Sequence, residues 1–129
     1  MNRAEFDAFC GSLPATTHVV QWGGASVWKV GGKIFAVCTG WGKDGQLAAD
    51  TGKPAKDRIG FKCSDLSYDI LRQQPGIIPS PYLARAKWVQ VRTEDALNDD
   101  ELKAYIEQAH SIIARKLTRA TRKKLDLGR

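Results

Sequence analysis

Three cysteines and two histidines are the side chains that could supply a nucleophile, a disulfide or a soft metal site. Cys10, Cys38 and Cys63 are odd in number and widely spaced, and the sequence contains neither a Cys-x-x-Cys pair nor a Cys/His cluster. A disulfide framework and a structural zinc site are therefore not indicated. Each cysteine has apolar neighbours, which predicts small buried side chains. His18 and His110 stand at no recognisable spacing from these thiols, so we predict no catalytic thiol.

Two further patterns are typical of enzymes but have a simpler structural explanation. The glycines between Gly40 and Gly45 read G-x-G-x-x-G, yet a charged stretch follows them instead of the long helix of a dinucleotide site. Acidic residues gather at Glu94-Asp95 and at 99–101, and the second group opens the last predicted helix, where it offsets the helix dipole. Because no oxygen ligands converge from several places, we predict no enzyme activity, no metal site and no cofactor.

Basic residues are concentrated at the end of the chain. Residues 1–114 hold 13 basic and 13 acidic side chains, whereas residues 115–129 hold seven basic side chains against Asp126 alone. The whole net charge of +6 therefore lies in the last fifteen residues. On one continuous helix, five of these side chains would fall within an arc of about 120°, beside an apolar stripe that can dock. The five are Arg115, Lys116, Arg119, Arg122 and Lys123, and Lys124 follows them directly.

Two interpretations of this basic end stay open. It is either a solvated tail that partly complements a helix dipole, or a site for DNA or another polyanion, bound through counterion release. Trp41, in a glycine-rich loop, could stack on bases, whereas Trp22, Trp28 and Trp88 are expected to pack in strands. The alternative function is a protein-interaction or small-ligand module, with a pocket between sheet and helices near Trp88 and Tyr82.

The first half of the chain predicts a helix followed by antiparallel strands. A helix over 2–12 begins at Asn2 with Glu5 at the capping-box position. Strands are expected over 17–22, 27–30 and 34–38, the last two joined by the turn Gly31-Gly32, whose residues tolerate positive φ. A loop or loosely formed hairpin is expected over 40–57.

The second half predicts one more pair of strands and two helices. A strand over 58–63 leads to a short helix that Ser64 caps, with Leu66, Ile70 and Leu71 on its inner face. Three prolines in 75–83 predict an extended connection. A half-buried final strand over 87–93 follows, and then a long helix from Asn98 that keeps its apolar phase as far as Ala120.

These elements predict an α+β fold of one domain. A single antiparallel sheet is packed by the N-terminal helix, the short middle helix and the long C-terminal helix. Residues 1–114 form the body, and 115–129 form a basic helical extension of the same domain. The longest apolar run, Ile34–Cys38, has five residues, so no segment can span a membrane. No apolar stretch follows Arg3, so no secretory signal is expected either.

The order of several motifs resembles the MmcQ/YjbR family over roughly residues 5–120. The motifs are Phe6-xx-Phe9-Cys10-xx-Leu13-Pro14, the hairpin 29–36, Phe61-Lys62-Cys63, the segment 75–79, Tyr82-Leu83, Lys87-Trp88 and Leu97-xx-Asp100-Glu101-Leu102. The resemblance implies a fold like that of CyaY (frataxin) and carries a DNA-binding label derived from a double-wing comparison. It brings no catalytic residues.

The resemblance adds candidate phosphate contacts outside the basic end, because its pattern has basic residues at Lys29, Lys33, Lys62 and Lys87. Taken together, the sequence leads us to expect a small, non-enzymatic, cytoplasmic monomer. It would bind DNA or another polyanion weakly through the basic C-terminal helix and these lysines, or else bind another protein.

Overall fold

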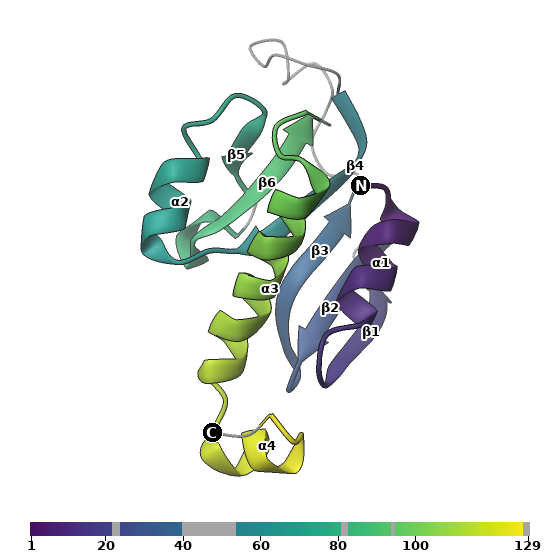
Figure 1. Cartoon of the computed structure of the whole chain (residues 1–129), viewed down its shortest axis with the longest axis vertical. Coiled ribbons are helices and arrows are strands. Elements are labelled where there is room, and N and C mark those ends of the chain that lie inside the picture. The colour runs from purple at the N-terminus through teal and green to yellow at the C-terminus, as the bar shows by residue number, and fades with distance from the viewer. Residues whose placement is uncertain (22–23, 40–53, 81–82, 94, 128–129) are drawn as a thin grey trace.

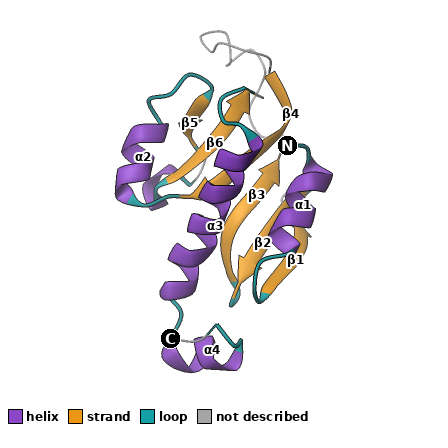
Figure 2. Cartoon of the chain, viewed as in Figure 1, coloured by secondary structure: helices purple, strands orange, loops and turns teal. Residues whose placement is uncertain are grey.

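The computed structural model of the 129-residue chain describes residues 1–21, 24–39, 54–80, 83–93 and 95–127. A six-stranded antiparallel sheet in the order β1-β2-β3-β4-β6-β5 forms its centre (Figures 1 and 2). The strands are β1 (Thr16–Gln21), β2 (Ala25–Val30), β3 (Lys33–Thr39), β4 (Pro54–Lys62), β5 (Ile77–Pro79) and β6 (Trp88–Thr93). The predicted α+β fold with one antiparallel sheet is confirmed.

Two helices lie on one face of this sheet. Helix α1 (Arg3–Gly11) packs on β1 and β2, and helix α3 (Asp99–Arg115) packs on β3 and β4 (Figure 1). The short α2 (Asp65–Leu71) lies on the β6 side, and α4 (Arg119–Lys124) extends beyond the end of α3. The main core lies between sheet and helices, and it includes Phe35, Phe61 and Ile106, which are all fully buried.

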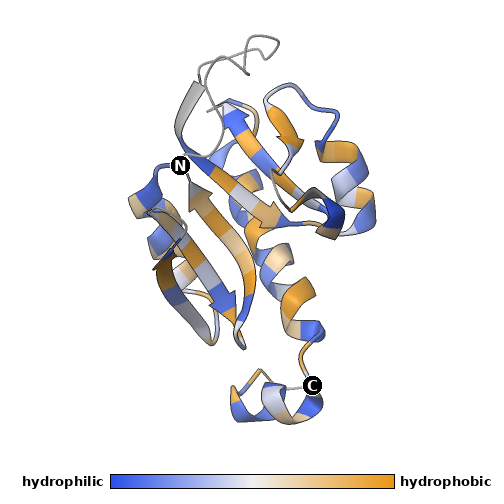
Figure 3. Ribbon diagram, turned by 180° about the vertical axis from the view of Figure 1, so that it is seen from behind, coloured by the Kyte–Doolittle hydropathy of each residue, from blue (hydrophilic) through white to orange (hydrophobic). Residues whose placement is uncertain are grey.

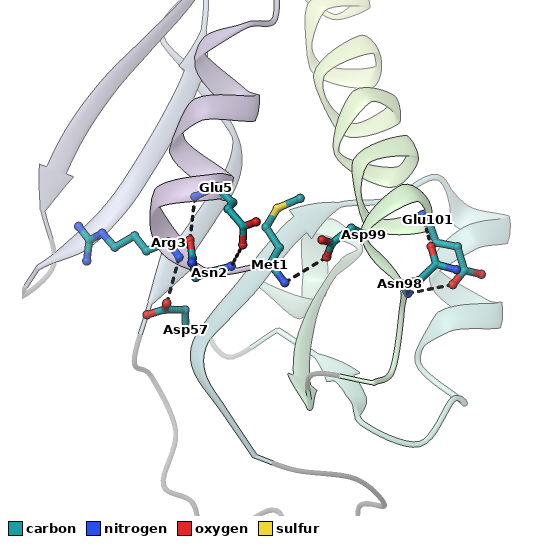
Figure 4. A network of polar contacts seen from close by, with 8 residues as sticks. All are labelled: Met1, Asn2, Arg3, Glu5, Asp57, Asn98, Asp99 and Glu101. Atoms are coloured by element: carbon teal, nitrogen blue, oxygen red, sulfur yellow. Dashed lines mark hydrogen bonds and ion pairs between the residues drawn. The ribbon is translucent and has the colours of Figure 1, made fainter.

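Capping boxes fix the starts of both large helices, as predicted. Asn2 Oδ1 accepts from Glu5 N at 2.8 Å and Glu5 Oε1 accepts from Asn2 N at 2.9 Å. Asn98 and Glu101 make the same two bonds at 2.8 and 3.0 Å. Figure 4 shows the two caps side by side, joined through the amino group of Met1, which lies 3.1 Å from Asp99 Oδ1. Arg3 N in turn donates to Asp57 Oδ2 at 3.0 Å and ties α1 to β4.

The prediction of one long C-terminal helix is wrong in one respect, because the structure has two helices in its place. Helix α3 ends with Arg115, and the tighter bonds Lys116 N to Ile113 O and Leu117 N to Ala114 O close its last turn. Thr118 then caps α4, its hydroxyl accepting from Thr121 N at 3.1 Å. Leu117, at the break between the two helices, lies in the main core.

The segment 75–83 is more than the predicted connection, because residues 77–79 pair with β6 as an edge strand. Strand β6 itself is buried along its whole length, so the prediction of a half-buried strand is wrong. Its side chains do alternate in facing: Val89 and Val91 join the main core, and Trp88 joins a second cluster on the face opposite α1 and α3, next to the 3-10 helix η2 (Ala84–Ala86). Leu83 packs on that cluster and covers the second face, which is viewed in Figure 3.

The prediction of which residues form the inner face of the middle helix is wrong for two of the three. Leu71 is fully buried, but Leu66 is 71% exposed and Ile70 is 49% exposed. Tyr68, which is half-buried, and Leu71 lie one turn apart on the inward side of α2. Leu66 and Ile70 therefore lie on its opposite side.

Strand β4 begins at Pro54, inside the segment predicted as a loop over 40–57. The remainder of that loop with Trp41, the predicted strand residue Trp22, and Tyr82 lie outside the described residues. The turn Gly31-Gly32 is confirmed, with φ of +60° and +80°, and joins β2 to β3.

Candidate polyanion interface

The tip of the β2–β3 hairpin meets the chain just after α3. A Cβ atom on Gly31 would lie 2.6 Å from Leu117 Cδ1, so the glycine permits this close approach. Exposed Lys33 follows the turn, and exposed Lys116 precedes Leu117. The hairpin tip, the end of α3 and α4 consequently share one end of the molecule (Figure 1). We call this end, together with Lys62 and Lys87, the basic end.

Lys62 is the most constrained cation of the basic end. It is the last residue of β4, it is only 8% exposed, and its Nζ donates to the carbonyl oxygen of Ala86. Burial lowers the pKa of Lys62, and the positive charges of Lys116 and Lys87 lower it further, against an opposing effect of Asp65. Two of the cations predicted from sequence, Lys116 and Lys87, therefore lie close enough to Lys62 to act on its charge.

Lys87 is held by the backbone as well as by its side chain. Its φ is +64°, in the left-handed region that side chains other than glycine rarely adopt. Its carbonyl accepts from Cys63 N at 2.8 Å, which fixes it beside the end of β4. Its Nζ lies 5.0 Å from the centre of the Tyr68 ring, while Arg72 Cζ lies 5.7 Å from the same ring. Tyr68 thus contacts two cations, Lys87 beside the end of β4 and Arg72 at the C-terminal end of α2.

Helix α4 carries the rest of the basic end and has no buried residue. Leu117 anchors it in the main core, and half-buried Leu125 and Leu127 pack against that core. Within the described part of the chain, no basic side chain from 115 to 124 forms an ion pair with a carboxylate. These cations are therefore available to an external anion.

The sequence-predicted cations are arranged differently from the single ridge expected on one helix. Arg115 and Lys116 end α3, and Arg115 Nη2 donates to Ser111 Oγ at 3.0 Å. The next four cations belong to α4, across the break at Thr118: Arg119, Arg122, Lys123 and Lys124. Lys29 is half-buried on the sheet face opposite α1 and α3, beside Ile34 across the hairpin.

Sequence reasoning missed a polar cluster between α1 and the first two strands. Asp7 Oδ1 accepts from Ser26 Oγ at 2.5 Å and from Trp28 Nε1 at 2.9 Å. His18 Nε2 lies 2.7 Å from Ser26 Oγ, and its ring stacks on Trp28 at 4.6 Å. Ser26 gives its proton to Asp7, so its oxygen accepts from His18, which is opposite to the direction of a serine nucleophile. Ser26 is also fully buried, so the cluster is structural.

Buried polar residues also cross the face of the sheet opposite α1 and α3. Arg58, Gln90 and Arg92 are at most 4% exposed and lie on the neighbouring strands β4 and β6. Gly60 pairs with Gln90, and a Cβ on Gly60 would lie 3.5 Å from Ser80 Oγ. The alternation of side chains in 87–93 indicates on which face of the sheet Gln90 and Arg92 lie. It does not indicate which chain segment covers them.

The cysteines and His110 have the structural roles predicted for them. All three thiols are free and buried. Burial raises the pKa of Cys38 and of Cys63 to about 12 and that of Cys10 still further. His110 Nε2 donates to Pro14 O at 2.8 Å and its ring meets Phe35 edge to face. Within the described ranges, no group of three or more His, Cys, Asp or Glu could hold a metal ion, and no helix could cross a membrane.

Comparisons with known proteins identify a family and two similar structures. A search of curated proteins gives no match. A Deinococcus radiodurans protein, DR2400, whose domain is described as DUF419, has a similar structure with a TM-score of 0.74 and 20% identity over 95% of this chain and 86% of its own. A protein from Pseudomonas syringae follows with a TM-score of 0.67 and 21% identity over 88% of this chain and 99% of its own. These two likenesses show the fold. The family model described as YjbR matches residues 11–112, and the chain therefore belongs to the YjbR family.

Proposed function

We propose that this protein binds duplex DNA weakly, through phosphate contacts made by its basic end, and has no enzymatic activity. The observation that carries the proposal is that Lys116, at the end of α3, and Lys87 lie near enough to Lys62 to act on its charge, while Lys116 also begins the run of cations that continues into α4. Ammonium and guanidinium groups bind phosphate irrespective of base sequence, so the binding would be non-specific.

The alternative interpretation, a solvated basic tail, explains the positions of fewer of these basic residues. Charge complementation of a helix dipole acts only in the last turn, which contains Arg115 in α3 and Arg122, Lys123 and Lys124 in α4. It gives no reason for Lys62 and Lys87, which come from strand ends rather than from the tail. A group of mutually repelling cations, one of them buried, is stabilised when an anion lies among them. A phosphate chain supplies such anions at regular spacing.

The test is the salt dependence of binding to a fluorescent duplex of about 20 base pairs, measured by anisotropy. Each phosphate contact contributes a slope of roughly −0.9 in the logarithmic plot of affinity against salt. We expect Lys116→Gln to weaken binding and to reduce the slope by roughly one contact, and Lys123→Gln/Lys124→Gln to reduce it further.

Lys103→Gln is the matched control, because Lys103 is exposed on α3 and lies outside the basic end. It should leave both the affinity and the slope unchanged. Salt-independent binding, no binding at 50 mM salt, or an equal effect of Lys103→Gln would each refute the proposal.

A protein-interaction role is the second candidate, supported by one observation. Leu66 and Ile70 lie one turn apart on α2 and are both exposed, which is uncommon for large apolar side chains in a small soluble domain. A partner that survives nuclease treatment and is lost from Leu66→Ser/Ile70→Ser would favour this role. Retention of the same partner by the variant would exclude α2 as its site.

A further inference from the structure

Strand β1 leaves one edge of the sheet open. It stands at the end of the strand order and pairs with β2 on one side only (Figure 1). In the described part of the chain, no backbone hydrogen bond from outside the sheet reaches residues 16–21. The peptide groups on the outer side of β1 can therefore bond to another extended chain.

The opposite edge of the sheet is closed. Strand β5 has only three residues, and one of them, Pro79, has no N–H group. The N–H of Ile77 is already used, because it donates to Gln74 O at 3.1 Å. Within the described sheet, association edge to edge is therefore left to β1.

Strand β1 has none of the devices with which proteins usually protect an edge. Its sequence, TTHVVQ, contains no Pro, Gly, Lys, Arg, Asp or Glu, and its pairing with β2 has no bulge. Val20 is 54% exposed, so an apolar side chain also faces solvent on this strand. A strand without these charges can pair with a copy of itself without repulsion between like charges.

We propose that the protein forms a two-fold symmetric dimer in which β1 of one copy pairs antiparallel with β1 of a second copy. The two sheets become one, and both α1 helices lie on the same side of it. Residues that face this side then stand opposite one another across the new strand pair. Val20 faces this side, because it pairs with Ser26, whose Oγ donates to Asp7 of α1. The second copy therefore covers Val20 with its own Thr16 or His18.

The antiparallel arrangement also separates the charges of the two copies. Thr16 pairs with Val30, next to the hairpin tip at the basic end, whereas Gln21 pairs with Ala25 at the other end of the hairpin. In the dimer the Thr16 end of one strand lies beside the Gln21 end of the other. The two basic ends consequently lie at opposite ends of the dimer and do not repel each other at close range.

Helix α1 leaves room for a second copy on the side of this edge. Asp7 marks that side of the helix, because its Oδ1 lies 3.9 Å from His18 Nε2 on β1. At about 100° per residue, Ala4 and Gly11 lie within about 60° of Asp7 around the helix axis. Both are small and exposed, so the α1 helices of two copies can approach each other across the joined strands.

The test is the concentration dependence of association of the full chain in the absence of DNA. A pair of six-residue strands buries less area than a standard interface, so we expect a dissociation constant on the order of 100 µM. Sedimentation velocity from roughly 1 µM to roughly 1 mM, a range that brackets this value, should show a monomer giving way to a dimer. Amide hydrogen exchange at the two ends of the range locates the interface. Exchange should slow in 16–21 at high concentration and stay unchanged in α2.

One variant and its matched control test the position of the interface. Val20→Lys adds a charge at the edge, and the exposed side chain can be replaced without disturbing the core. It should weaken the dimer by at least about tenfold, because two-fold symmetry makes each substitution count twice. Leu66→Lys is the control, since it places the same charge at an exposed apolar position on α2. It should leave the dissociation constant unchanged, and circular dichroism checks that both variants are folded.

Three outcomes would overturn the proposal. A monomer throughout the concentration range would leave the β1 edge to a strand from another protein. Slowed exchange in α2 rather than in 16–21, or equal weakening by Leu66→Lys and Val20→Lys, would place the interface elsewhere. Because no DNA is present, none of these outcomes bears on the proposed function.

Discussion

Gly31 and Leu117 lie against each other, with the position of a Gly31 Cβ only 2.6 Å from Leu117 Cδ1. The contact joins the tip of the β2–β3 hairpin to the segment between α3 and α4. The two residues are 86 positions apart in the sequence. It brings the hairpin to the end of α3 where Lys116 lies. The shape of the basic end therefore depends on a residue without a side chain.

Substitution of Gly31 tests this contact. Gly31→Ala adds a Cβ that clashes with Leu117 and also strains a backbone with φ of +60°, so we expect a loss of about 2–3 kcal/mol in the free energy of unfolding in urea. Gly32→Ala is the control, because φ is +80° there but no heavy atom lies within 4 Å of the added Cβ. It should lose only about 1 kcal/mol. Equal losses would mean that Leu117 moves aside freely.

The break between α3 and α4 can be tested by the sign of one substitution. Thr118 caps α4 through its hydroxyl, so Thr118→Ala should increase amide hydrogen exchange over 119–124, corresponding to a loss of about 1 kcal/mol. On a continuous helix the same change would increase helicity instead, because alanine is the better helix former. Thr118→Ser keeps the capping oxygen and should leave exchange unchanged.

The features that sequence predicted correctly are those determined within a few residues. The capping boxes at Asn2 and Asn98 and the turn at Gly31-Gly32 each depend on local geometry alone, and all three are confirmed. The apolar alternation of β6 likewise gives the correct facing of Val89 and Val91.

The features that sequence could not give depend on partners far away in the chain. Just after the end of α3, Leu117 packs on Gly31 from the distant hairpin, and residues 77–79 form a strand by pairing with the edge of β6. Asp7 forms its cluster only because α1 lies over Ser26 and Trp28. Charge counting found the cations of 115–124, but only the fold brings Lys116 and Lys87 near Lys62.

The lowered pKa of Lys62 predicts a pH dependence of stability. The folded state binds its proton less tightly than the unfolded state, whose lysine titrates near 10.5. Between these two values the unfolded chain holds more protons, so this group makes the free energy of unfolding rise with pH. We expect the difference in stability between the wild type and Lys62→Met to shift in favour of the wild type as pH rises through that window. A difference that stays constant with pH would show that the two states bind the proton equally.

The same measurement on Lys103→Met provides the control, because Lys103 is exposed. The difference in the free energy of unfolding between Lys103→Met and the wild type should not change over the same pH range. Taking differences also removes the opposing contribution of Cys10 and Cys38, whose raised pKa values reduce stability as pH rises above 9 in all three proteins. Cys63 differs from them, because the charge of Lys62 lowers its pKa and is lost in Lys62→Met.

The cluster around Asp7 should stabilise the packing of α1 on the sheet. Asp7→Asn removes the charge that accepts from Ser26 Oγ and Trp28 Nε1, and we expect a loss of about 1–3 kcal/mol in urea unfolding followed by tryptophan fluorescence. Asp69→Asn is the control, since Asp69 forms only an exposed contact with Arg72 and should lose less than about 0.5 kcal/mol. If the bonds act as a unit, Ser26→Ala will cost less in the Asp7→Asn background than in the wild type. Additive losses would instead show that Ser26 and Asp7 stabilise the fold separately.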